Sequence, residues 1–360
     1  MTDVHQYPCE NCGAQLAFQP GSTSLKCPYC GHETKIDFQT DTVHELALDD
    51  WLHKAVLDTE LEKDKVLHCN NCAAEFTVPA NQETQECPFC GSNVVVPTES
   101  EQRIPPNGVL PFAIPDKQAR EFVTKWLSSR FWAPNDLKTL ALKEGRLKGM
   151  YLPYWTFDSQ TETDYTGQRG EHYYETESYT DSDGNRQTRE VQRTRWYPAA
   201  GHVSVHFDDI LVLGSGSLPP KHAQRLRTWN LEAVVGYEPK FLVGFQSMRY
   251  DVDLATGFTT AQQFMQPTID GAIRSDIGGD EQMISSKDTD YLENTFKLLL
   301  LPIWVGGYRY RGKSFRFLVN GQTGEIQGEA PISVWKVIIA VILGLIVLGL
   351  IIVLSQHKGR

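Results

Sequence analysis

The sequence lacks the motifs that identify two common classes of hydrolase, the Gly-x-Ser-x-Gly nucleophile elbow and the His-Glu-x2-His zinc motif. It is also short of positive charge, with 34 Lys and Arg residues against 45 Asp and Glu residues and a formal net charge of −11. Protein contacts with nucleic-acid phosphates depend on Lys and Arg. The composition therefore argues against an ordinary nucleic-acid-binding protein, and the stretch from Val66 to Thr98, which has no Lys or Arg, does so most strongly.

Cysteine is sparse but ordered. All eight cysteines fall into two copies of Cys-x2-Cys-x14-Cys-x2-Cys, and the copies are offset by 60 residues at every cysteine. Two Cys-x2-Cys turns can bring four thiolates around one tetrahedral Zn²⁺ ion. The sequence therefore predicts two zinc ribbons with two structural Zn²⁺ sites, formed by Cys9, Cys12, Cys27 and Cys30 and by Cys69, Cys72, Cys87 and Cys90.

Disulfides and redox pairs are the alternatives for these cysteines. Disulfides need an oxidising compartment, but the N-terminal residues Met1 to Gln6 lack the apolar core of a signal peptide. A redox Cys-x2-Cys pair normally stands alone at the start of a helix. Four thiolates also leave no open position for the water of a catalytic zinc ion. We therefore expect zinc to be structural and to supply most of the folding free energy of each ribbon.

The C-terminal region contains an unbroken apolar run from Val337 to Leu354. As a helix, this run would be about 27 Å long, close to the thickness of the bilayer hydrocarbon. Trp335 and Lys336 precede it at a position suited to lipid headgroups, and a soluble core helix would carry polar residues on one face. The basic residues on the two sides of the run are equal in number and give no orientation. We expect a tail-anchored, single-pass protein of the cytoplasmic membrane with its N-terminal part in the cytosol.

The order of these features predicts six segments. They are zinc ribbon 1 (1–38), a helical connector (39–66), zinc ribbon 2 (67–98), an α+β domain (99–332), a transmembrane helix (333–355) and a tail (356–360). The large domain is expected to contain a dominant antiparallel sheet, with a helix over Lys117–Arg130 capped by Asp116 and a further helix over Pro219–Val235. Leu-Pro-Tyr-Trp at 152–155 and Leu-Pro-Ile-Trp at 301–304 hint at a duplicated strand unit.

Other candidate sites are not supported by the residues that flank them. Residues Gly307–Ser314 match the formula of a phosphate-binding P-loop, Gly-x4-Gly-Lys-Ser, but strand-like sequences flank them where a helix must follow. We therefore predict a hairpin turn there. His202 and His206 flank an extended segment and would lie about 13 Å apart, too far for one metal ion. The acidic run from Glu171 to Asp181 is typical of a solvated strand face, and no catalytic residue, cofactor or small-molecule substrate is predicted.

Several phrases recur together in one bacterial family: two four-cysteine ribbons, the two Leu-Pro-x-Trp strands, Asp209–Val212 before Ser217–Pro219, a Gly-Lys hairpin, Val319–Gly324 and a final hydrophobic helix. The chain resembles the membrane-anchored double zinc-ribbon proteins encoded beside SPFH (band 7, flotillin-like) proteins and relatives of phage-shock protein A. Such proteins are often labelled primosomal-helicase-like because that helicase carries similar zinc motifs.

The resemblance implies a non-enzymatic membrane adaptor that docks an SPFH or phage-shock-type protein at the cytoplasmic membrane face during envelope stress. Docking through the ribbons is our hypothesis, because their surfaces are near neutral or acidic. The alternative is a zinc-ribbon protein that binds nucleic acid or takes part in replication with a helicase. That alternative accounts for the ribbons alone, and the missing basic residues of ribbon 2 count against it.

Overall fold

The structure is a computed structural model of the 360-residue chain. It describes residues 7–38, 43–53, 62–63, 65–68, 75–78, 85–86, 93–94, 96–98, 102–134, 136–137, 147–180, 182, 184–216, 225–226, 228–248, 250–311 and 313–358. Within these ranges, only the backbone is described for 62–103, 309, 314, 350 and 352–358.

Short strands dominate the N-terminal region, and a few long elements dominate the rest. The short strands are β1 (Ala17–Phe18), β2 (Ser24–Lys26), β3 (Glu33–Lys35), β4 (Leu46–Ala47), β5 (Glu62–Lys63), β6 (Lys65–His68), β7 (Glu75–Val78), β8 (Gln85–Glu86), β9 (Asn93–Val94), β10 (Val96–Thr98), β11 (Gln102–Arg103), β12 (Gly108–Val109), β15 (Val235–Gly236), β16 (Gln246–Ser247) and β19 (Ile326–Gly328). The long strands are β13 (Lys148–Thr180), β14 (Arg186–Leu213), β17 (Glu281–Tyr310) and β18 (Lys313–Asn320). The helices are α1 (Leu48–His53), α2 (Asp116–Ser129), α5 (Leu254–Ile277) and α6 (Val334–Lys358), with 3-10 turns η1 (Leu231–Ala233) and η2 (Pro239–Leu242).

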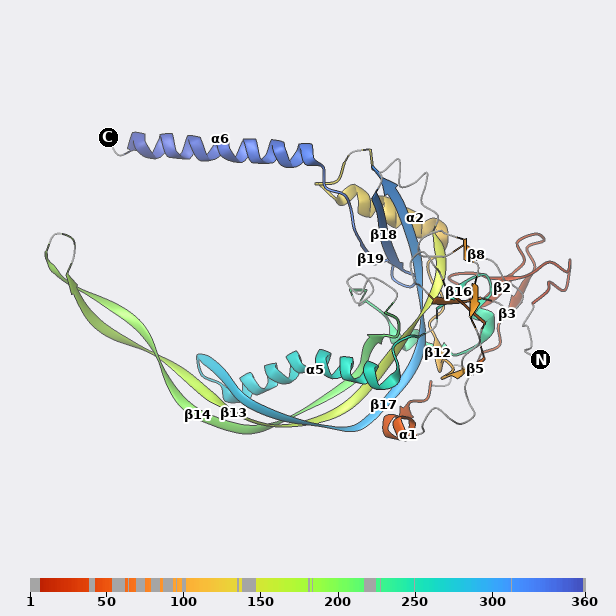
Figure 1. The fold of residues 1–360 in the computed structure, drawn as a ribbon, viewed down its shortest axis with the longest axis horizontal. Coiled ribbons are helices and arrows are strands. Elements are labelled where there is room, and N and C mark those ends of the chain that lie inside the picture. Colours follow the sequence, from red (N-terminus) through yellow and green to blue (C-terminus); the bar gives the residue numbers. More distant parts are fainter. Residues whose placement is uncertain are drawn as a thin grey trace.

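The predicted α+β architecture with a mainly antiparallel sheet is confirmed. The 33-residue strand β13 lies between β14 and β17, and β17 pairs in turn with β18. Fully extended, β13 spans about 110 Å. The hairpin of β13 and β14 therefore leaves the body as a long curved arm (Figure 1). From Glu281 onward, β17 runs beside this hairpin back into the body.

The arm curves because both neighbours of β13 are bulged at the same level. The pairing with β14 shifts between Phe157 and Ser159, and the pairing with β17 shifts between Asp158 and Gln160. Asp209 and Glu293, the residues opposite this point, have positive φ values of 54° and 51°. Bulges bend a strand and increase its local twist. The curved sheet then has room for α5 on its concave side (Figure 1).

Helix α5 supplies the apolar cover for the root of the arm. Asp253 caps its N-terminus by accepting a hydrogen bond from the Thr256 N–H at 2.8 Å, and Gly278 ends it with φ of 65°. Its buried residues recur mostly every four positions, which places them on one helix face. They are Leu254, Gly257, Ala261, Met265, Ile269, Ile273 and Ile277, and they pack on a cluster that includes Trp155 and Phe157.

Beyond α5 the arm is a polar two-stranded ribbon held by charge pairs. The acidic strand segment that contains Glu175 and Glu177 lies opposite a basic one, and Arg193 contacts both carboxylates while Arg189 contacts Glu177 at 3.3 Å. These side chains are exposed, as predicted for this run. The sequence reasoning missed the arginine partners, which become neighbours only through the hairpin register that joins Glu177 to Arg189.

The two Leu-Pro-x-Trp phrases mark an internal duplication with approximate two-fold symmetry. They pair with each other, Leu152 opposite Leu301 in antiparallel register. In each half a short strand runs parallel to the long strand of the other half. In the first half β12 pairs with Leu299 and Leu300 of β17, and in the second half β16 pairs with Met150 and Tyr151 of β13. In each half a long helix begins seven residues after this short strand ends, α2 after β12 and α5 after β16.

Hydrogen bonds repeat the same symmetry. The carbonyl of Pro153 accepts from Gly214 at 2.9 Å, and that of Pro302 accepts from Gly321 at 2.8 Å. The Trp155 indole donates to the carbonyl of Val252, just before the N-cap of α5, at 2.9 Å. The Trp304 indole donates to the carbonyl of Ile114, just before the N-cap of α2, at 2.9 Å. Each tryptophan therefore fixes the start of the helix that belongs to the other half.

Three local predictions need correction. Asp116 is the first residue of α2 rather than its cap; Pro115 occupies the cap position, and Asp116 instead pairs with Arg120 at 2.9 Å. The helix predicted from Pro219 is reduced, within its described residues, to η1 (Leu231–Ala233) followed by β15. Within 43–65, the described helix is α1 alone, and β5 and β6 begin at Glu62 and Lys65. In the second and third cases tertiary pairing overrode a weak local helical pattern.

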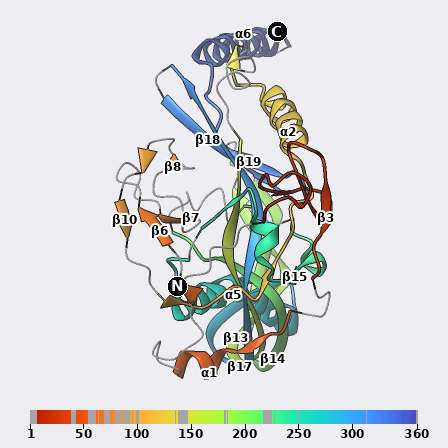
Figure 2. The same ribbon diagram turned by 90° about the vertical axis from the view of Figure 1, so that its right-hand side faces the viewer.

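Helix α6 leaves the body on the same side as the arm (Figures 1 and 2). Its described apolar side chains from Val337 to Ile351 are mostly exposed, with Ile339 at 55% and Leu345 at 64%. Among the residues that the structure describes, no helix meets the length and apolarity needed to span a membrane. The predicted transmembrane helix at 333–355 is therefore not supported by the described residues.

Candidate metal centre

Ribbon 1 presents its cysteines from two hairpin turns of the same shape. In the first turn the Gly13 N–H donates to the Cys9 carbonyl at 2.8 Å; in the second the Gly31 N–H donates to the Cys27 carbonyl at 3.1 Å. Gly13 and Gly31 have φ values of 73° and 75°, a left-handed conformation that favours glycine. Each glycine therefore allows its turn to close, and the two sulfurs of each turn face the sulfurs of the other turn.

The four sulfurs of ribbon 1 converge as predicted. The Sγ atoms of Cys9 and Cys30 are 3.5 Å apart, as are those of Cys12 and Cys27, and all four Sγ atoms lie within 4.8 Å of one another. A tetrahedral Zn²⁺ ion with Zn–S bonds of about 2.3 Å holds its sulfurs about 3.8 Å apart. Cys9 and Cys27 are buried, whereas Cys12 and Cys30 are exposed. The donor set and spacing fit a structural zinc ion with a closed coordination sphere.

Backbone amides favour the thiolate form at the second turn. A hydrogen bond from the His32 backbone, assisted by Asn11, lowers the pKa of the Cys30 thiol to about 6. The Cys30 backbone lowers the pKa of the Cys27 thiol in the same way. For Cys12, the Ala14 backbone acts to lower the pKa, but the neighbouring Cys27 and Cys30 sulfurs outweigh it and raise the pKa to about 12. The metal-free tetrad thus keeps a proton on Cys12 that zinc must displace.

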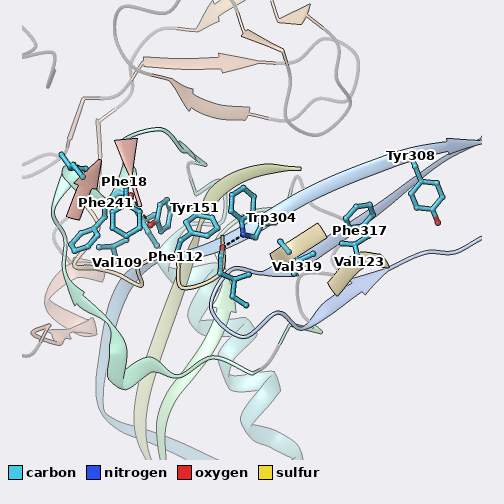
Figure 3. Close-up of a cluster of buried hydrophobic side chains, with 14 of the residues drawn as sticks. Phe18, Val109, Phe112, Val123, Tyr151, Phe241, Trp304, Tyr308, Phe317 and Val319 are labelled. Atoms are coloured by element: carbon cyan, nitrogen blue, oxygen red, sulfur yellow. Dashed lines mark hydrogen bonds between the residues drawn. The ribbon is translucent and has the colours of Figure 1, made fainter. Parts of the chain in front are cut away.

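The ribbon is docked on the body by an aromatic contact that the sequence does not reveal. The Phe18 ring meets Phe241 edge-on at 5.4 Å and lies 6.3 Å from Phe245. The Phe18 N–H donates to the Val243 carbonyl at 2.9 Å, and the Gly21 N–H donates to the Phe112 carbonyl at 2.8 Å. Figure 3 shows Phe18 and Phe241 in one continuous apolar cluster with Phe112, Tyr151 and Trp304. The metal centre is therefore held in a fixed place relative to the sheet.

The second tetrad, Cys69, Cys72, Cys87 and Cys90, lies outside the described residues. The backbone pairs that flank it are described, and they repeat those of ribbon 1 at the same offset of 60. Pro8 pairs with Gln15 and His68 with Glu75; Lys26 pairs with Glu33 and Glu86 with Asn93. The two segments that contain the four cysteines are thus flanked by the same backbone pairs as in ribbon 1.

A second cluster with possible metal ligands lies at the bulge in the arm. Asp158, Asp208 and Asp209 bring carboxylate oxygens within 4.8 Å of one another. The ammonium of Lys297 already lies there, 2.9 Å from Asp209 and 3.1 Å from Glu45. Burial raises the pKa of Asp158, although it accepts hydrogen bonds from the Asp209 N–H at 2.6 Å and the Thr295 hydroxyl at 2.9 Å. These ion pairs form an ionic clamp on the bulge, in which the Lys297 ammonium takes the place that a metal ion would occupy.

The remaining sequence candidates are structural. Residues Gly307–Ser314 form the hairpin of β17 and β18, as predicted, with Tyr310 opposite Lys313. His202 lies between two carboxylates, with its ring nitrogens 2.7 Å from Glu162 and 2.8 Å from Asp164. Hydrogen bonds to Asp164 and Glu162 raise the pKa of His202. Asp208 and Asp209 lie at the bulge in the arm.

The chain is similar over nearly its whole length to the uncharacterized protein YdjG of Bacillus subtilis (strain 168). The two are 25% identical over 337 residues, which covers 93% of this chain and 92% of that protein. No family model and no solved structure matches the chain.

Proposed function

We propose that the protein is a non-enzymatic, zinc-stabilised membrane adaptor whose two ribbons dock a partner protein at the cytoplasmic face of the membrane. The observation that carries this is the cysteine tetrad of ribbon 1, closed to catalysis by four sulfurs and fixed to the body through Phe18. The second tetrad, bracketed by the same backbone pairs, is proposed to hold the second Zn²⁺ ion.

Docking is assigned to the tips of the zinc turns. Tyr29, between Cys27 and Cys30, is 84% exposed. Exposed tyrosines of this kind are preferred anchors in protein interfaces. Phe89 occupies the equivalent place in the sequence of ribbon 2. Of the cations in ribbon 1, Lys26 is already paired with Glu33 at 2.7 Å, which leaves little positive charge for a nucleic-acid phosphate.

Anchoring is assigned to α6. A monomeric soluble protein rarely exposes a large continuous apolar surface, and the apolar run Val337–Leu354 needs a bilayer or a partner to cover it. Charged side chains of the arm cannot share the hydrocarbon, because burying a charge there costs several kcal/mol. The arm must therefore lie outside the hydrocarbon layer that α6 is proposed to span.

The resemblance to the SPFH-associated family supplies the partner class: an SPFH or phage-shock-type protein recruited under envelope stress. The test is affinity purification of the full-length chain from detergent-solubilised membranes, followed by mass spectrometry. Cys9→Ser with Cys12→Ser tests the zinc, and Tyr29→Ala tests docking with the zinc retained. Val191→Ala, a smaller truncation on the arm and outside the ribbon, is the control.

We expect the partner to be recovered with wild type and with V191A, and to be lost with the cysteine variant and reduced with Y29A. Full recovery from every variant would refute docking through ribbon 1. Recovery of nucleic acid or replication proteins in place of a membrane-associated partner would refute the adaptor function.

A further inference from the structure

The root of α6 lies against the tip of the β17–β18 hairpin and encloses a cavity of about 780 Å³. Three segments that are distant in sequence line it: the chain after α2, the hairpin and the first turn of α6. The first turn of α6 is held in place by Lys336, whose ammonium donates to the carbonyls of Phe131 at 2.9 Å and Ala133 at 2.7 Å. The Ser333 N–H adds a bond to the Trp132 carbonyl at 2.7 Å.

The lining combines cations with apolar surface. Arg311, Lys313 and Lys336 supply positive charge. Arg311 lies at the hairpin turn and has a positive φ of 48°. Among the described residues, Asp136 is the one acid in the lining, and its carboxylate accepts a hydrogen bond from the Tyr310 hydroxyl at 3.1 Å. In a chain with a net charge of −11, this excess of cations is a local reversal.

The apolar part of the lining combines aromatic and aliphatic side chains, most of them exposed. Phe315, Ile332, Val334 and Trp335 line the cavity, and Trp335 is 72% exposed. Phe131, beside the cavity at the end of α2, is 73% exposed and lies 5.7 Å below the Lys336 ammonium. Aromatic and basic side chains gathered at the start of an apolar helix are typical of the headgroup layer of a membrane. Basic pockets at that depth bind anionic lipid heads.

We propose that this cavity binds one anionic phospholipid, with its phosphate headgroup on Arg311, Lys313 and Lys336 and its first acyl carbons on Phe315 and Trp335. The proposal rests on the proposed membrane location, since the membrane supplies the lipid. A lipid so placed bridges the body and the root of α6. The angle between α6 and the body therefore depends on the lipid composition of the membrane.

The test uses the full-length chain in neutral detergent micelles, titrated with phosphatidylglycerol or phosphatidylcholine that carries bromine on its acyl chains. Quenching of tryptophan fluorescence reports binding, and Trp335→Phe identifies the reporter. A basic side chain near an anionic lipid surface contributes about fivefold in binding. Because Lys336 already donates to two backbone carbonyls, Arg311 and Lys313 set the preference, and we expect phosphatidylglycerol to quench at a roughly 25-fold lower mole fraction than phosphatidylcholine. Inorganic phosphate at millimolar concentration should fail to reverse the quenching.

Arg311→Asn with Lys313→Gln removes two exposed cations from the cavity, and Asn tolerates the positive φ of position 311. Lys26→Gln with Lys35→Gln in ribbon 1 makes the same change in charge far from the cavity. The preference for phosphatidylglycerol should disappear in the first pair and persist in the second. Equal quenching by both lipids in wild type, or a preference unchanged by R311N/K313Q, would overturn the proposal. Release of the protein from membranes by alkaline carbonate would instead refute the anchor, and it leaves the quenching result unaffected.

Discussion

Replacing Trp155 with Phe should loosen the start of α5, about 100 residues further along the chain. The Trp155 side chain is fully buried, and its indole N–H is the donor to the Val252 carbonyl at 2.9 Å. Phenylalanine keeps most of the apolar ring but has no N–H. Loss of this partly buried hydrogen bond costs about 0.5–1.5 kcal/mol. Local opening at the first turn of α5 should therefore become roughly 2- to 13-fold more frequent.

The symmetry of the two halves gives this prediction its control. Trp304→Phe removes the donor to the Ile114 carbonyl and should loosen the start of α2 by a similar factor, while α5 remains unchanged. Trp132→Phe, on a side chain that is 44% exposed, should change neither helix. Hydrogen exchange of the full-length protein, read by mass spectrometry on peptides that cover 115–121 and 253–259, measures all three. Loosening of both helices by either substitution would refute the crossed pairing of each tryptophan with the other half's helix.

Three further outcomes are expected. Purified protein should contain two Zn²⁺ ions per chain at neutral pH by atomic emission. Dialysis toward acid should release the ion of ribbon 1, because zinc binds the thiolate form and protons compete for the four sulfurs as the pH falls; two retained ions at pH 4 would contradict this. The raised pKa of His202 means that its contacts with Glu162 and Asp164 stabilise the fold fully below the pKa of an unfolded histidine, about 6.5, and that this stabilisation is lost as the pH rises through the folded value. The protection factors of amides 160–166, corrected for the intrinsic rise of exchange with pH, should therefore be lower at pH 8.5 than at pH 5.5, and His202→Gln should abolish the difference. Gly321→Ala should destabilise the body by about 1–3 kcal/mol in a urea titration, because a Cβ there would lie 2.6 Å from the Phe112 ring, whereas Gly271→Ala, with open space around it, should be neutral or stabilising.

The sequence determined the features that depend on local spacing. Four thiols in Cys-x2-Cys pairs converge because each pair needs only one tight turn, and the glycine that follows supplies it at Gly13 and Gly31. The β-hairpin at Gly307–Ser314 was also predictable from the sequence, because alternating aromatic residues on both sides of a Gly exclude the helix that a P-loop requires. The sequence also indicated the duplicated strand unit, through its two Leu-Pro-x-Trp phrases.

The contacts between these elements depend on how the whole chain packs. The length of β13 and β17 was not predictable, because a strand continues for as long as a neighbour pairs with it, and that neighbour lies far away in sequence. The same is true of the crossed tryptophans, the Phe18 contact that fixes ribbon 1 and the Lys297 clamp at the bulge. The cations of Arg311 and Lys313 meet the root of α6 for this reason as well. Contacts between residues 20 to 250 positions apart are set by the packing of the whole chain, and local patterns carry no record of them.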